Sequence, residues 1–338
     1  MGQESDTMTD YLKDNERFAD VFNGGCFRGQ KVINPEDLEE GSESYKEVGN
    51  KKTTSRIRDV KKRLKSGGRL KILAIEDQND IDFTMPWRHM NYDSLEYGEQ
   101  IKQLKRRNRR KKLLKTDAEY KCGLRSTDRL APVFTACLYH GKEKWTGPRS
   151  LKDMINFGED AELWEPLFSD YQFQLICINE LEDFSRFESP LKELFMVLAC
   201  RQDKGKLRKL ITENEIYQKL DSETANVIGV MVGMQKQVKA QKKEGNEVNM
   251  CEALRDLVND SKMEGKAEGL AQGMAQGMAQ GTSLYLISMV QAKYRKGKSL
   301  EVIADETEET SEVIRPILSL VTQYPTESKE EIYGRLQQ

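Results

Sequence analysis

A glycine turn between two strand-like segments is the feature that most constrains this chain. The segments are residues 54–60 and 70–78, and the turn lies at residues 66–68, where two glycines follow a serine. Paired glycines supply the positive φ angles that tight turns between antiparallel strands require. The sequence therefore predicts a β-hairpin, and with it a fold that contains a sheet.

Acidic and amide side chains gather at the open end of this hairpin. Because side chains alternate across a strand, Glu76 and Gln78 share one face of the second strand and Asp77 occupies the other. Asp59, near the end of the first strand, can then meet Glu76 across the hairpin. Neighbouring carboxylates repel each other unless a cation lies between them, and hard oxygen ligands suit Mg²⁺ or Mn²⁺. The alternative interpretation is a solvated acidic pair on the polar face of a hairpin.

These residues resemble the active site of the PD-(D/E)XK nucleases. More narrowly, they are similar to the Rpn group of recombination-promoting nucleases and transposases. The segments that carry the resemblance occur in the order of that group: 15–23 (NERFADVFN), 58–60 (RDV), 75–78 (IEDQ), 85–88 (MPWR) with 92–93 (YD), 132–141 (PVFTACLYHG) and 145–148 (WTGP). Together they cover about the first two thirds of the chain.

The resemblance implies an α/β fold with a PD-(D/E)XK core, in which helices flank a mixed sheet, followed by a helical C-terminal region. It implies a metal-dependent DNA endonuclease that serves recombination or the movement of mobile elements. Asp59 and Glu76 would hold Mg²⁺ or Mn²⁺, Gln78 would orient the water or the phosphate, and Glu16 would contribute a further acid. The wider superfamily has a lysine where this chain has Gln78, which can orient a water through its carbonyl but carries no charge.

Positive charge is concentrated between residues 51 and 115. This stretch has 20 Lys and Arg against 8 Asp and Glu, whereas the whole chain has a net charge of -2. The predicted DNA-binding residues lie in its densest part: Lys105, Arg106, Arg107, Arg109, Arg110, Lys111 and Lys112. Such a run suits nucleic-acid phosphates, and a solvated helix face or a disordered loop is the alternative. No aromatic residues are interleaved with it, so we expect backbone contacts that are blind to sequence.

The remaining patterns of the first two hundred residues predict alternating helices and strands. The expected elements are a helix over 10–23, a largely irregular segment over 27–48, a helix from about Trp87 into the basic run, strands over 133–139 and 170–178, and a helix over 190–201. The strand over 133–139 is continuously apolar, which predicts a central, buried position.

The chain after residue 200 has a helical, highly charged pattern. The predicted domains are 1–200 (nuclease-like), 201–262 (helical extension), 263–282 (glycine repeat) and 283–338 (tail). Helices are expected over 204–218 and 225–238 in the extension. In the repeat, glycine recurs every fourth position from Gly265 to Gly281. It is either a self-association helix, which would make the protein a homo-oligomer, or a flexible linker.

The tail predicts two helices with a turn near residues 308–310, capped by Ser299 and Ser311. This pattern resembles a helix-turn-helix. However, the second helix has only Arg315 as a basic side chain and contains Pro316. A bundle or protein-contact module is therefore favoured over DNA recognition.

Composition indicates a cytoplasmic protein. Charged residues make up 33% of the chain, no apolar run is long enough to span a bilayer, and the acidic N-terminus is unlike a signal or transit peptide. Six scattered cysteines predict reduced thiols, and the two histidines, His89 and His140, make a histidine-rich zinc site improbable. We interpret His140 as a turn residue before Gly141 rather than as a ligand.

Three functional hypotheses follow. The first is the metal-dependent endonuclease. The second is a nucleic-acid-binding protein whose nuclease site is inactive. The third is an oligomeric scaffold or transcription-associated protein built on the helical C-terminal half.

Overall fold

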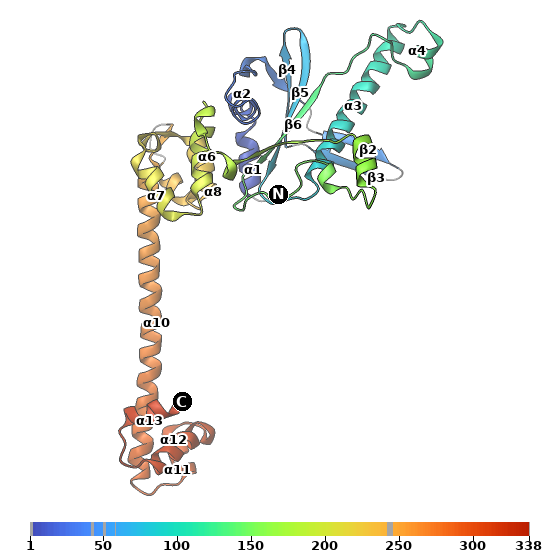
Figure 1. The fold of residues 1–338 in the computed structure, drawn as a ribbon. Helices are drawn as coiled ribbons and strands as arrows, with labels where there is room; N and C mark the ends of the chain where they lie inside the picture. The colour runs from blue at the N-terminus through green and yellow to red at the C-terminus, as the bar shows by residue number, and fades with distance from the viewer. Residues whose placement is uncertain (1–2, 42–43, 50–51, 58, 242–245, 338) are drawn as a thin grey trace. The chain divides into compact units, whose positions relative to one another are not determined.

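The structure, a computed structural model, describes residues 3–41, 44–49, 52–57, 59–241 and 246–337, with backbone alone for 44–49 and 52–57. It has two units, Met1–Leu257 and Val258–Gln338. The fold is mixed α/β with a helical C-terminal region (Figure 1).

A five-stranded mixed sheet forms the centre of the first unit. Its strands, in spatial order, are β1 (Leu38–Glu40), β4 (Val60–Ser66), β5 (Arg69–Gln78), β6 (Val133–Tyr139) and β7 (Gln174–Cys177). The pairs β1–β4 and β4–β5 are antiparallel, whereas β5–β6 and β6–β7 are parallel. The predicted strand over 133–139 is confirmed, and the one predicted over 170–178 is shorter.

The hairpin prediction is right about the turn and the second strand but wrong about the first. β4 begins at Val60, and residues 52–57 form β3 (Lys52–Ile57), which pairs with β2 (Ser44–Gly49) in a separate sheet. The reason lies in the turn. Gly67 and Gly68, both at positive φ, form a two-residue loop. Such a loop makes the residues just before it the pairing strand. Asp59 therefore lies immediately before β4, and the register continues to place it opposite Glu76.

One face of the sheet packs against helices from both ends of the first unit. They are α1 (Gln3–Tyr11), α2 (Asn15–Asp20) with the π-helical turn η1 (Val21–Cys26), α6 (Leu191–Cys200) and α8 (Ser222–Met231). The core between them includes Phe18, Leu73 and Leu138. The predicted single helix over 10–23 is wrong. The chain breaks after α1, and Asp14 caps a new helix by accepting from two backbone amides.

The other face packs against α3 (Met85–Arg110), which confirms the long helix predicted into the basic run. A second apolar cluster, including Met85 and Tyr139, lies here. Lys61 of β4 and Glu96 of α3 form a buried ion pair at 2.6 Å. Beyond the far end of α3 lies α4 (Asp117–Cys122), as Figure 1 shows.

The other elements of the first unit are short: η2 (Pro35–Asp37), η3 (Lys152–Met154), α5 (Ala161–Trp164), η4 (Glu165–Leu167), η5 (Ile178–Glu180), η6 (Phe184–Arg186), α7 (Lys204–Glu213), η7 (Glu215–Gln218), β8 (Leu220–Asp221), α9 (Gln235–Gln241) and β9 (Glu247–Val248). The helix predicted over 190–201 is confirmed as α6. The helix expected over 225–238 is instead two helices, α8 and α9, because Gly233 lies between them at φ +75°. All six cysteines are free thiols.

The glycine repeat is helical. It lies within α10 (Met250–Tyr294), and a Cβ built on any of its five glycines would meet nothing within 4 Å among the atoms described. The tail contains α11 (Leu300–Thr307), α12 (Ser311–Gln323) and α13 (Lys329–Leu336), which pack with the end of α10 around Ile287 and Ile314. The two predicted tail helices are thus present, but the cap of the second is Thr310. Within the described residues, no helix has the length and apolar character needed to cross a membrane.

Candidate metal and phosphate site

A cavity of about 1190 Å³ opens at the C-terminal end of β5. The residues that line it come from α1, from the strand ends and following loops, from α3 and from the α8–α9 region: Gln3, Glu4, Ser5, Asp59, Asp77, Gln78, Asn79, Asp80, Ile81, Arg88, Tyr92, Tyr139, Lys142, Glu143, Val230 and Gln235. Two of the predicted site residues, Asp59 and Gln78, thus line one cavity together with Asp77.

Asp59 is fixed against the end of β5. Its Oδ2 accepts a hydrogen bond of 2.8 Å from the backbone N–H of Asp77. The hairpin register accounts for this contact, since Asp59 directly precedes the Val60–Ile75 pair. The register places Asp59 opposite Glu76, as predicted, and this hydrogen bond joins Asp59 to the backbone of the next residue, Asp77.

Glu76 lies behind the cavity wall. Its side chain is 1% exposed, and its Oε2 lies 3.4 Å from Nη2 of Arg88 on α3. Alternation along β5 accounts for this placement, because Ala74 and Glu76 face α3. Glu76 is not among the residues that line the cavity, but it contacts Arg88, which is.

Gln78 lines the cavity directly. Its Nε2 donates a hydrogen bond of 2.8 Å to the carbonyl oxygen of Asp80. Since the amide nitrogen is held there, the carbonyl oxygen is the end of the side chain that can accept a hydrogen bond from a water. This geometry suits the orienting role predicted for Gln78.

Asp77 and His140 form a buried pair that the sequence analysis missed. Oδ1 of Asp77 lies 2.9 Å from Nε2 of His140, and both side chains are fully buried. The other oxygen, Oδ2, accepts from the hydroxyl of Ser5 on α1 at 3.1 Å. His140 lies directly after β6 and before Gly141, outside any helix or strand, as predicted, but its ring is buried in the fold. The buried strand that precedes it was the signal, since a strand end in the core carries its next side chain inward.

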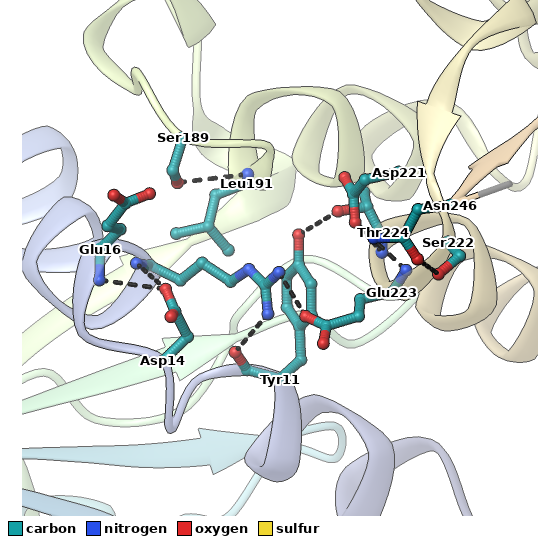
Figure 2. A network of polar contacts seen from close by, with 11 residues as sticks. Tyr11, Asp14, Glu16, Ser189, Leu191, Asp221, Ser222, Glu223, Thr224 and Asn246 are labelled. Atoms are coloured by element: carbon teal, nitrogen blue, oxygen red, sulfur yellow. Dashed lines mark hydrogen bonds and ion pairs between the residues drawn. The ribbon is translucent and has the colours of Figure 1, made fainter.

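Glu16 lies elsewhere. It lines a separate pocket of about 520 Å³ with Asp20, Lys31 and Glu188, and it is not among the residues around the main cavity. Figure 2 shows its surroundings, where Asp14 accepts from the backbone N–H of Glu16 at 3.0 Å. The neighbouring polar network joins α1 and α2 to α8. The structure therefore does not bring Glu16 together with Asp59 and Gln78.

The basic run forms the last turns of α3 and the residues after it. Arg106, Arg109, Arg110, Lys111 and Lys112 are exposed, and Lys105 is half-buried. Arg107 is engaged differently, because its Nη2 lies 2.9 Å from Oδ1 of Asp128.

Asp128 is a buried carboxylate that ties this end of α3 to the loop after α4. It accepts from the Asn108 side chain at 2.6 Å and from the Arg125 backbone N–H at 2.9 Å. The backbone N–H of Arg125 and the amide of Asn108 lower the pKa of Asp128 to about 2. Of the predicted DNA-binding set, Arg107 is therefore partly structural.

The cavity is acidic overall. Its lining includes five carboxylates, Glu4, Asp59, Asp77, Asp80 and Glu143, and two cations, Arg88 and Lys142. These carboxylates and the Gln78 carbonyl are hard oxygen donors, which fit Mg²⁺ or Mn²⁺. Among the described residues, no group of three or more His, Cys, Asp and Glu is close enough to hold a metal alone. Mg²⁺ commonly uses one or two carboxylates and takes its other ligands from water and substrate phosphate.

Comparison of the chain with family models, with curated proteins and with solved structures found no match.

Proposed function

We propose that this protein is a metal-dependent DNA endonuclease with a PD-(D/E)XK-like core. The observation that carries the proposal is the meeting of Asp59, Asp77 and Gln78 in one acidic cavity at the end of β5. Helices on both faces of the mixed sheet suit such a core. The resemblance described for the sequence segments supports the same activity and its use in recombination.

The residues that would hold the divalent cation are Asp59 and Glu76, with Asp77 as the further carboxylate that lines the cavity. A divalent cation would polarise the phosphate and lower the pKa of a water molecule. The chain's own contribution is to place the carboxylates and to orient a water through the Gln78 carbonyl. For Glu76 to serve, it must release Arg88; their contact of 3.4 Å is longer than the usual charge-assisted hydrogen bond.

The exposed basic residues at the end of α3 would hold the DNA backbone. Arg106, Arg109 and Arg110 lie on the same helix as Arg88, which lines the cavity. Their separation from the acidic lining matters, because an acidic cavity alone repels phosphate. Binding and chemistry are thus assigned to two ends of one helix.

The experiment is cleavage of plasmid DNA by purified full-length protein with Mg²⁺ or Mn²⁺. The proposal expects nicking or linearisation by the parent, and its loss in Asp59→Ala and Glu76→Ala with DNA affinity retained. Glu159→Ala is the matched control, since it removes an exposed carboxylate that does not line the cavity. Cleavage at the parental rate by either acid variant contradicts the two-acid site.

A second candidate is a nucleic-acid-binding protein without cleavage activity. The observation that favours it is the burial of Glu76 against Arg88, since of the two predicted metal ligands Asp59 lines the cavity and Glu76 does not. Salt-sensitive DNA binding by the parent, with no cleavage in either metal, supports this second function over the first.

A further inference from the structure

Two positively charged side chains line the cavity, Lys142 and Arg88, and they differ in how firmly they are held. The side chain of Lys142 is exposed. The hydrogen bonds at this residue are made by its backbone carbonyl, which accepts from Asn179 at 3.1 Å and also from Gln202. Arg88 is 29% exposed, and its guanidinium is held by side chains. A charge fixed before a ligand arrives costs less conformational entropy on binding than a mobile one.

Arg88 is anchored at one end and loosely held at the other. Its Nη1 lies 2.8 Å from Oδ2 of Asp82, which is within the range of a charge-assisted hydrogen bond. Asp82 is itself fixed, because its Oδ1 accepts from the backbone N–H of Thr84 at 2.7 Å and from the Thr84 hydroxyl at 2.6 Å. The contact from Nη2 to Glu76, at 3.4 Å, is longer than a charge-assisted bond. The Glu76 side of the guanidinium is therefore the exchangeable one.

The electrostatics keep Arg88 charged. Burial acts to lower the pKa of Arg88, but the hydrogen bonds to Asp82 and Tyr92 and the charge of Glu76 raise it above its ordinary value. A guanidinium presents five N–H donors in a planar fork that matches phosphate oxygens. Arg88 can thus keep its bond to Asp82 while its other donors serve a ligand.

We infer that Arg88 is the phosphate-binding residue of the cavity and exchanges Glu76 for a non-bridging phosphate oxygen when substrate enters. The inference rests on the proposed function and adds a catalytic residue to it. When Arg88 turns to the phosphate, Glu76 can take part in binding the cation, so the arrival of substrate and the exposure of the second acid become one event. Asp82 is the positioning residue that aims the guanidinium.

The test is isothermal titration of the full-length protein with thymidine 3′,5′-bisphosphate in EDTA. This probe carries phosphates and is too short to reach the basic end of α3. Arg88→Ala is expected to weaken binding at least about tenfold, the cost of losing a charged hydrogen bond. Arg88→Lys is expected to retain part of the affinity. Lys142→Ala, the matched control that removes the other cation, is expected to bind within about twofold of the parent.

Glu76→Gln gives the decisive result, because it removes the carboxylate that competes for Arg88. It is expected to bind the probe more tightly than the parent, whereas a purely structural Arg88–Glu76 pair predicts weaker binding. Thermal unfolding of each variant identifies any that fail to fold. If Arg88→Ala fails to fold, Arg88→Lys and Glu76→Gln still decide the matter. Parental affinity in Arg88→Ala, weaker binding in Glu76→Gln, or no probe binding by the parent at millimolar concentration overturns the inference.

Cleavage separates this inference from the proposed function. With Mg²⁺, Arg88→Ala is expected to lower kcat about 10²- to 10³-fold, the range for removing one donor to a developing oxyanion. If the parent cleaves no DNA but its probe binding depends on Arg88, the proposed function fails and phosphate binding by Arg88 stands. If the parent cleaves and Arg88→Ala both cleaves and binds like it, the inference fails and the nuclease stands.

Discussion

Replacing Arg106, Arg109 and Arg110 together with alanine is expected to make DNA binding less dependent on salt. All three are exposed, so each can neutralise one phosphate. Each lost contact on duplex DNA reduces the slope of log K against log salt by about 0.9, so the triple variant should be shallower by about 2.7. Arg107→Ala is expected to change the slope far less, since Arg107 is paired with Asp128 at 2.9 Å.

The assay is fluorescence anisotropy of a labelled duplex titrated with full-length protein between 50 and 200 mM salt, without metal. Lys204, Arg208 and Lys219, replaced together, form the matched control, because they remove the same charge from exposed positions outside α3. Equal slopes for the parent and the α3 variant would refute the assignment of DNA binding to this helix end. A slope change in Arg107→Ala as large as one third of the triple effect would refute its structural role.

Three further outcomes are expected. Lys61→Met should destabilise the protein by about 3–5 kcal/mol in chemical denaturation, because it leaves a buried Glu96, and adding Glu96→Leu should recover most of that loss. Asp128→Asn should lower the thermal midpoint at pH 5 but not near pH 2: the folded pKa of Asp128, about 2, lies below its ordinary value of 3.8, so its stabilisation is present above pH 3.8 and is lost as the pH falls toward 2. A parental midpoint for Asp128→Asn at pH 5 contradicts that view. Gly273→Ala should stabilise α10 by about 0.8–1 kcal/mol, measured as helical circular dichroism during unfolding, because the added Cβ meets nothing within 4 Å; a loss of stability would indicate a contact at this glycine.

The sequence pattern was enough to predict those parts of the fold that depend on residues close together in the sequence. The paired glycines identified the turn, the apolar run identified β6, and the helical pattern over 190–201 identified α6. The first strand was misplaced because the strand pattern of residues 54–57 is compatible with pairing to β2 or to β5. Only the two-residue loop decides which strand pairs with β5. α1 was missed because its surface is acidic, although Met8 and Tyr11 lie three residues apart and are buried.

The candidate site was predictable only where strand alternation determines it. Alternation and the hairpin placed Asp59 beside the end of β5, and they placed Glu76 on the face away from Asp77. The side chains that contact Asp77 come from distant segments: Ser5 lies on α1, and His140 follows β6. Arg88 was visible in the sequence as part of a helix start, but its contact with Glu76 depends on how α3 crosses the sheet. Contacts of this kind follow from tertiary packing, which no local pattern encodes.

In the proposed enzyme, helix α3 would also set a minimum length of substrate. From Arg88 to Arg106 there are eighteen residues of continuous helix, or about 27 Å at 1.5 Å per residue. Duplex DNA rises about 3.4 Å per base pair, so a strand that runs along the helix needs about eight base pairs to reach from one arginine to the other. A cut site closer than that to a DNA end would reach the acidic cavity but lose the basic end of the helix. In the proposed enzyme, the length of one helix thus sets a minimum flank on one side of the break.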